Sequence, residues 1–290
     1  MMDNFPKLIK SVAEKLAQGE SVSVSHQQEA LWIVQHALKD LPLAEYNRRE
    51  SAINSLQINR INELLKRRIE MHEPIGYMFG TVPFCALEIK VRPPILIPRM
   101  ETEEWALMLI EKMRAHNFTA INILDLCTGS GCIALALASA FPQAKVIGVD
   151  VNPAAIELAR ENAEFLNLKN VSFLEKNIFE DLALDVQFDV IVSNPPYVTA
   201  SEWAGLVLDV KNWEDKIALV AEENGLIFYP QIASIARRLL KSAGTRIAVV
   251  EVGATQANEV VTMFAKEGFF NHEIFKDLFG QDRAIFFELR

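Results

Sequence analysis

Four consecutive residues, Asn194-Pro195-Pro196-Tyr197, are the stretch best suited to chemistry. They follow an apolar, β-branched run at 188–193 that predicts a short buried strand, and prolines cannot continue a strand because they lack a backbone N–H. The prolines fix φ and restrict the residues before them, so the loop is stiff. An amino or amide nitrogen entering it would find the Asn194 side-chain oxygen and a proline carbonyl as acceptors, beside the apolar Tyr197 ring. The stretch predicts a site that orients a nitrogen; an ordinary proline-rich turn is the alternative.

A glycine-containing turn is the second candidate site. Residues 121–126 predict a strand, residues 132–141 an apolar helix, and the turn between them is Cys127-Thr128-Gly129-Ser130-Gly131. Its backbone N–H groups can approach a ligand closely because glycine carries no side chain. Asp150 ends the next predicted strand, residues 145–149, where a carboxylate can accept both hydroxyls of a ribose.

This turn and acid fit either a dinucleotide or S-adenosylmethionine. The dinucleotide fingerprint requires a third glycine that packs the helix against the strand. Here Cys132, Ile133 and Ala134 follow Gly131, and no glycine stands in that place. We therefore predict S-adenosylmethionine as the cofactor, at a strand end beside the Asn194 loop.

The elements that must position these residues alternate between strand and helix. Further strands are predicted at 171–174, 188–193, 246–252, 272–275 and 284–289. Seven strands with crossover helices predict an α/β fold, a doubly wound, Rossmann-like sheet. Ligands of such sheets bind at the carboxyl ends of the strands, which is where both candidate sites lie.

The chain divides into three parts by composition. Residues 1–72 contain a single glycine and space their apolar residues at helical intervals, which predicts a small N-terminal helical domain. Residues 73–100 are rich in proline and glycine and predict a β-hairpin linker. Residues 101–290 form the predicted sheet domain. Arg67 and Arg68 are expected to be a solvated helix end.

Composition bounds the class of protein. The chain has 290 residues, half of them hydrophobic, a net charge of -9 and a pI near 5.2. The acidic balance argues against a protein that grips nucleic-acid phosphates. Three cysteines without metal-ligand or redox spacing indicate a reducing compartment and no metal site. No apolar stretch is long enough for a membrane span, no secretory signal is present, and the first twenty residues make a poor mitochondrial presequence.

With these motifs in place, the sequence resembles the protein release factor glutamine methyltransferases, the HemK/PrmC family. The resemblance rests on Pro74-Ile75-Gly76-Tyr77, Ile97-Pro98-Arg99-Met100-Glu101-Thr102-Glu103, residues 124–131, Asn194 to Tyr197, Glu251-Val252-Gly253, and Lys276-Asp277 with Asp282-Arg283. It implies that Cys127, Thr128, Gly129, Ser130, Gly131, Asp150, Asn177 and Asn194 contact S-adenosylmethionine. It also implies that Asn194, Pro195, Pro196 and Tyr197 hold a glutamine amide from the Gly-Gly-Gln loop of a peptide-chain release factor, and that the helical domain helps to dock that partner.

Three positions depart from the pattern of bacterial members. Cys127 replaces a usual glycine, so its backbone is expected to adopt a conformation open to non-glycine residues; Asn177-Ile178 replaces an aromatic residue; and Glu214-Asp215 replaces a Glu-Pro. The segment 92–99 and the cysteine-bearing turn resemble fungal mitochondrial members. This resemblance implies a mitochondrial location and a mitochondrial release factor as partner, with a cytoplasmic location as the alternative.

Two other functions use the same features. The first is methylation of an adenine or guanine amino group in nucleic acid, against which the acidic balance and the lack of a Lys/Arg-rich recognition domain argue. The second is a non-catalytic subunit that keeps the cofactor fold for binding, against which the intact tetrapeptide and the ribose acid argue.

Overall fold

The computed structural model describes residues 5–19, 25–39, 53–118 and 121–289, which form two compact units. Unit 1 contains the described residues up to Gly80 together with Val207–Trp213, and unit 2 contains those from Thr81 to Leu206 and from Glu214 onward. The division lies inside the segment 73–100 that the sequence predicts as a linker. Residues 1–4, 20–24 and 40–52 of the predicted domain 1–72 lie outside the described part. Among the described helices, none combines the length and apolarity needed to cross a bilayer.

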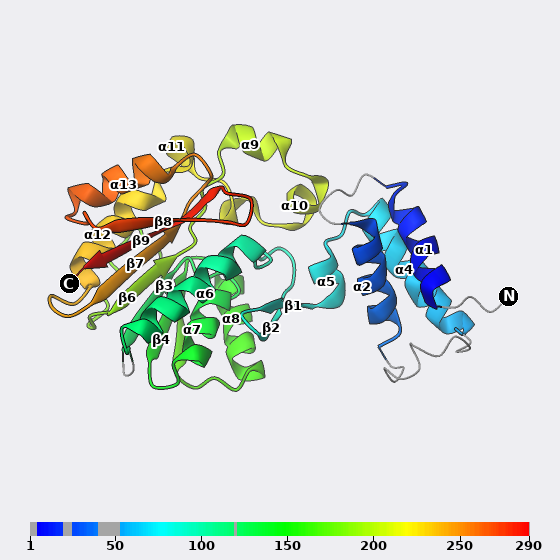
Figure 1. Ribbon diagram of the computed structural model, residues 1–290, viewed down its shortest axis with the longest axis horizontal. Coiled ribbons are helices and arrows are strands. Elements are labelled where there is room, and N and C mark those ends of the chain that lie inside the picture. The colour runs from blue at the N-terminus through cyan, green and yellow to red at the C-terminus, as the bar shows by residue number, and fades with distance from the viewer. Residues whose placement is uncertain (1–4, 20–24, 40–52, 119–120, 290) are drawn as a thin grey trace. The chain divides into compact units, whose positions relative to one another are not determined.

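Unit 1 is helical, as predicted. Its helices are α1 (Phe5–Leu16), α2 (His26–Ala37), α4 (Ser55–Glu70), α5 (Ile75–Phe79) and α10 (Leu208–Trp213); α1 to α5 are coloured blue to cyan in Figure 1. Helix α4 begins with a capping box in which Asn54 and Gln57 satisfy each other's backbone N–H groups. The apolar residues that recur at helical spacing, among them Leu16, Val34 and Leu65, form the core of this unit.

Arg68 contradicts the expectation of a solvated helix end. Its side chain is buried and donates to Glu29 at 2.9 Å and to Asp209 at 2.7 Å. Because an arginine fork can serve two carboxylates at once, it ties α2, α4 and α10 together. The indole of Trp213 adds a hydrogen bond of 2.9 Å to the Met71 carbonyl. The segment 207–213 is therefore held to the helical bundle through side chains distant in sequence.

Unit 2 contains the predicted seven-stranded sheet, in the order β5-β4-β3-β6-β7-β9-β8. The parallel strands are β3 (Asn122–Leu126), β4 (Lys145–Asp150), β5 (Val171–Glu175), β6 (Val190–Ser193) and β7 (Arg246–Glu251). The last two, β8 (His272–Lys276) and β9 (Asp282–Leu289), run antiparallel and close one edge. Leu126 pairs with Ser193 on one side and with Val149 on the other. The residues that follow these three strands therefore share one sheet edge.

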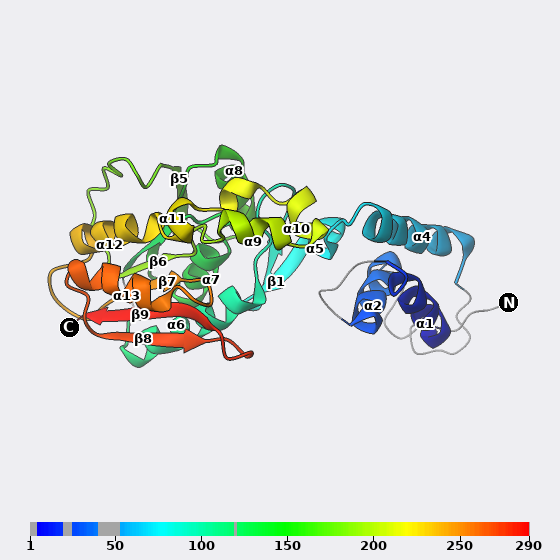
Figure 2. The ribbon, with the colours of Figure 1, turned by 90° about the horizontal axis from the view of Figure 1, so that it is seen from above.

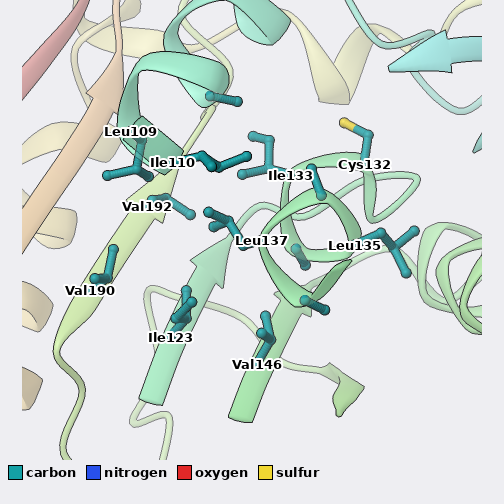
Figure 3. Close-up of a cluster of buried hydrophobic side chains, with 14 of the residues drawn as sticks. Leu109, Ile110, Ile123, Cys132, Ile133, Leu135, Leu137, Val146, Val190 and Val192 are labelled. Atoms are coloured by element: carbon teal, nitrogen blue, oxygen red, sulfur yellow. The ribbon is translucent and has the colours of Figure 1, made fainter. Parts of the chain in front are cut away.

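Helices cover both faces of this sheet. On one face lie α6 (Met100–Ala115), α7 (Cys132–Ala140) and α8 (Pro153–Phe165); on the other lie α12 (Phe228–Leu239) and α13 (Ala257–Lys266), as Figure 1 shows. Helix α7 is buried almost all round because it lies between the strands and α6. Figure 3 shows Ile133 and Leu137 of α7 among Ile123, Val192 and Leu109 of the surrounding elements.

Shorter elements complete unit 2. The predicted hairpin is present as β1 (Thr81–Phe84) paired with β2 (Leu87–Lys90). After β6 come α9 (Ala200–Gly205), a 3-10 turn at Lys216–Ala218 and α11 (Glu222–Gly225). These last elements form the long connection that follows the Asn194 loop.

Candidate active site

A cavity of about 290 Å³ lies at the carboxyl ends of β3, β4 and β6. The predicted site residues that line it are Cys127, Gly129, Asp150, Asn177, Asn194 and Pro196. The glycine-containing turn, the acid and the Asn194 loop thus share one hollow, as the order of the parallel strands requires.

Asp150 is held in place by backbone groups. Its Oδ2 accepts a hydrogen bond of 2.9 Å from the Gly129 N–H, and its Oδ1 accepts one of 2.9 Å from the Asn152 N–H. Burial raises the pKa of this carboxyl, and the backbone hydrogen bonds oppose the rise. A carboxylate has about four acceptor positions, so both oxygens can still accept from a diol. The acid is therefore positioned to bind a ribose.

The turn has an uncommon backbone conformation at Cys127. Cys127 has φ +60°, in the small left-handed region that favours glycine but is open to non-glycine residues, as expected. Gly129 has φ +55°, and a Cβ there would meet nothing within 4 Å. At Gly131, by contrast, a Cβ would lie 2.9 Å from the Phe173 ring. Gly129 leaves room in the cavity, whereas Gly131 lets α7 pack close to the strands.

Thr128 and Ser130 support the turn from within and do not line the cavity. The Thr128 hydroxyl donates to Asp125 Oδ2 at 2.6 Å, and the Ser130 carbonyl accepts from the Asn162 side chain at 3.0 Å. Both side chains are buried. Any contact of these two residues with a cofactor therefore has to come from the backbone.

Apolar side chains that sequence reasoning missed line another part of the cavity. They are Ile95, Val151, Ile178, Phe179, Ile217 and Phe228. The rings of Phe179 and Phe228 lie 5.1 Å apart. The Asn177 side chain accepts from the Phe179 N–H at 3.0 Å and so shapes this wall. The signal available in the sequence for this wall was Phe179. It directly follows Asn177-Ile178, the pair that replaces an aromatic residue of bacterial members. An adenine ring fits such a lining.

The Asn194 amide has one defined orientation. Its Nδ2 lies 3.2 Å from Thr102 Oγ1, which in turn donates to Glu251 Oε2 at 2.6 Å. Because the Thr102 proton is given to the carboxylate, Thr102 can only accept from Asn194. Asn194 Oδ1 takes no part in this chain of bonds and keeps its acceptor capacity.

Glu251 is the buried anchor of this network. Besides Thr102, its carboxylate accepts from the Trp105 indole at 2.8 Å and from the Tyr197 hydroxyl at 3.1 Å. Burial raises the pKa of Glu251, and the three hydrogen bonds oppose that rise. Burial, followed by the Glu251 charge, also raises the pKa of the Tyr197 hydroxyl, which therefore stays protonated and donates. The segment 99–103, whose role the sequence left open, thus reaches the Asn194 loop through Thr102.

The two ends of the tetrapeptide border different hollows. Tyr197 lines a second hollow of about 490 Å³ together with Gly253, Gln256 and Arg283. The Tyr197 carbonyl accepts from Gln256 Nε2 at 3.0 Å. Asn194 and Pro196 line the first cavity, while Pro195 is buried and lines neither.

The connection at 214–218 closes the first cavity. Glu214 is buried and pairs with Arg99, and the Asp215 N–H donates to the Pro94 carbonyl at 2.8 Å. Both Asp215 and Pro94 line the cavity. Within the described ranges, no three His, Cys, Asp or Glu side chains converge closely enough to hold a metal ion. The first cavity thus brings the oriented acceptor of Asn194 and the carboxylate of Asp150 to one hollow.

Comparisons with known proteins show which family and which fold this chain resembles. A family model described as a methyltransferase domain matches residues 117–281. A release factor glutamine methyltransferase of Thermodesulfovibrio yellowstonii is 37% identical over 89% of this chain and 91% of its own. One of Fusobacterium nucleatum is 38% identical over 78% of this chain, which spans 63% of that relative's length. The crystal structure of a methyltransferase from Pyrococcus furiosus, 20% identical, covers 79% of this chain and 98% of its own with a TM-score of 0.50, a likeness of fold.

Proposed function

The chain belongs to the release factor glutamine methyltransferase family, and on that premise we propose that it methylates a glutamine side chain in a protein. The substrate we propose is the glutamine of the Gly-Gly-Gln loop of a peptide-chain release factor. The observation that carries this proposal is the Asn194 amide, fixed through Thr102 so that its oxygen remains an acceptor at the edge of the cofactor cavity. An acceptor held in one direction can orient an N–H nitrogen.

S-adenosylmethionine is the proposed methyl donor, and the residues of the first cavity fit it. Asp150 would bind the ribose hydroxyls, Gly129 leaves open space beside them, and Phe179 and Phe228 would flank the adenine. Cys127, Asn177 and Asn194 border the same hollow, and backbone groups of Thr128, Ser130 and Gly131 complete the turn. When bound, this cofactor supplies a methyl group on a positively charged sulfur.

The chain's own contribution is to position a poor nucleophile. An amide nitrogen reacts weakly because its lone pair is delocalised, so orientation supplies much of the rate. Asn194 Oδ1 at the cavity edge would accept one amide hydrogen, and the backbone carbonyl of the otherwise buried Pro195 would accept the other, with Pro196 and Tyr197 as the apolar border. Acceptors on both N–H groups stabilise the positive charge that develops on nitrogen as it is methylated. The methylated nitrogen then loses one proton to solvent, and because it becomes acidic only at that stage, no histidine base is assigned.

The helical residues 1–72 are proposed to help dock the release factor.

The release factor, and the enzyme with it, is proposed to be mitochondrial. The support for the mitochondrial proposal is the resemblance of segment 92–99 and of the Cys127-bearing turn to fungal mitochondrial members. A cytoplasmic enzyme is the alternative. Fractionation of cells that express the full chain with a C-terminal tag decides between them, because the tag leaves the N-terminus unaltered. Recovery of the chain in the cytosol alone removes the mitochondrial proposal.

A transfer assay with a labelled methyl donor tests the substrate. We expect label on the release factor, and none on that factor once the Gly-Gly-Gln glutamine is changed to alanine. Label on RNA or DNA in place of protein would instead support the nucleic-acid alternative, whose acceptor amino group the same loop could hold. Binding of the donor without transfer to any of the three would support the non-catalytic alternative.

Asn194→Ala tests the residue that carries the proposal. Loss of the oriented acceptor should lower kcat roughly 100-fold while the affinity for S-adenosylhomocysteine changes little. Asn271→Ala, which removes an exposed asparagine just before β8, is the matched control and should keep full turnover. Wild-type turnover in the Asn194 variant would remove this residue from the mechanism.

A further inference from the structure

The turn between β8 and β9 displays two large apolar side chains to solvent. Leu278 is 82% exposed and Phe279 is 75% exposed, whereas most large apolar side chains of unit 2 are buried. Neighbouring exposed apolar residues of this size characterise interaction surfaces. Figure 2 shows the turn extending beyond the ends of both strands.

Asp277 makes this turn rigid. Its Oδ1 accepts from the Phe279 and Gln281 N–H groups, each at 2.9 Å, and its Oδ2 accepts from Arg283 Nε at 2.7 Å. The Asp277 backbone adds hydrogen bonds to Gln281 and Gly280. The Asp277 side chain is fully buried, although its neighbours in the turn are exposed. The conformation that displays Leu278 and Phe279 is therefore formed before any partner arrives, which lowers the entropic cost of binding.

The turn adjoins the Asn194 loop through two connections. The Leu278 N–H donates to Glu104 Oε2 at 3.3 Å, and Glu104 belongs to α6, the helix that carries Thr102. On the same face of α6, one turn earlier, Met100 is 59% exposed. Arg283, which braces the turn, lines the second hollow together with Tyr197. The exposed apolar residues therefore belong to α6 and to the turn that Arg283 braces, the two elements linked to the Asn194 loop.

We propose that Leu278, Phe279 and Met100, the tip surface, bind an apolar patch on the protein domain that presents the target glutamine. This inference rests on the proposed function. A glutamine held in a protein loop brings its domain with it, and that domain must lie across the residues that border the loop on the side away from the cofactor cavity. Pre-formed apolar side chains next to a polar site are the anchors that such a contact uses.

The test compares a protein substrate with a peptide. The double variant Leu278→Ser/Phe279→Ser is assayed on full-length release factor and on a short peptide that contains Gly-Gly-Gln. We expect KM for the release factor to rise at least tenfold with kcat unchanged, and kcat/KM for the peptide to stay at the wild-type value. Phe270→Ser is the matched control, because Phe270 is 77% exposed but precedes β8 at its other end. It should leave both substrates unaffected.

Each other outcome overturns the proposal. An unchanged KM for the release factor excludes docking at the tip surface. Equal losses on both substrates would mean that the turn supports the active site itself. Wild-type dimers that the double variant converts to monomers, seen by light scattering, would assign the surface to a second copy of the chain. A wild-type chain that methylates neither substrate removes the proposed function and this surface with it, whereas an active wild type with an unaffected variant removes the surface alone.

Discussion

Thr102 and Asn194, 92 positions apart in sequence, are joined by a hydrogen bond of 3.2 Å between Oγ1 and Nδ2. The bond has one direction because the Thr102 proton goes to Glu251 at 2.6 Å. A residue of α6 thereby decides which atom of the Asn194 amide remains available as an acceptor. Thr102 is a positioning residue, since it acts through Asn194 and does not line the cofactor cavity.

Thr102→Val should lower kcat while KM for the methyl donor stays near its wild-type value. Valine has nearly the same shape as threonine but cannot accept from Asn194 Nδ2, so the amide can rotate and present nitrogen in place of oxygen. The loss of about one hydrogen bond, roughly 1.4 kcal/mol, corresponds to about a tenfold fall in kcat. Thr102→Ser keeps the hydroxyl and should restore turnover. Equal turnover in the valine and serine variants would contradict the positioning role.

Gly225→Ala should impair both stability and turnover. Gly225 has φ +82°, and a Cβ there would lie 2.1 Å from the Tyr197 carbonyl oxygen, so the tetrapeptide loop would have to move. Gly244→Ala is the matched control, because Gly244 has φ +84° but a Cβ there meets nothing within 4 Å. The backbone conformation alone should cost about 1 kcal/mol in each variant, and the clash should add to it only at Gly225. Urea unfolding and steady-state kinetics measure the two effects. The same stability and full activity in both variants would show that the loop absorbs the clash.

Asp125→Asn should change how stability depends on pH. Burial raises the pKa of Asp125 to about 7, from an ordinary value of 3.8. Between these two pKa values the folded protein keeps a proton on Asp125 that the unfolded chain has lost. The contribution of Asp125 to the free energy of unfolding therefore falls as pH rises through this window and is constant above it. About three pKa units correspond to roughly 4 kcal/mol. The asparagine variant carries no such proton and should lose less stability between pH 5 and pH 8.

Urea unfolding at several pH values provides the measurement for Asp125. Asp185→Asn, in which the aspartate is exposed, controls for the removal of one carboxyl group. Stability curves for wild type and Asp125→Asn that stay parallel from pH 5 to pH 8 would show that the buried carboxyl is ionised throughout.

Local patterns in the sequence were sufficient for the sheet and for the outline of the site. The β-branched runs predicted the strands, and the prolines after Ser193 marked where β6 ends. Because parallel strands end at the same edge, placing Cys127, Asp150 and Asn194 at the carboxyl ends of β3, β4 and β6 also placed them around one cavity. The order of the strands in the sheet, with the antiparallel β9 between β7 and β8, came from the structure.

Only the tertiary structure decided which side chains distant in sequence meet, in the helical unit and around the site. Arg68 was expected to be solvated, yet it meets carboxylates on α2 and α10 that lie 39 and 141 positions away. Glu251 joins Thr102, Trp105 and Tyr197, and Phe228 contacts Phe179 in one wall of the cofactor cavity. Apolar periodicity records which face of an element is buried, whereas these contacts depend on where distant elements meet once both faces of the sheet are covered. The sequence alone thus determined where the reacting groups lie along the chain, and packing determined which way the Asn194 amide faces.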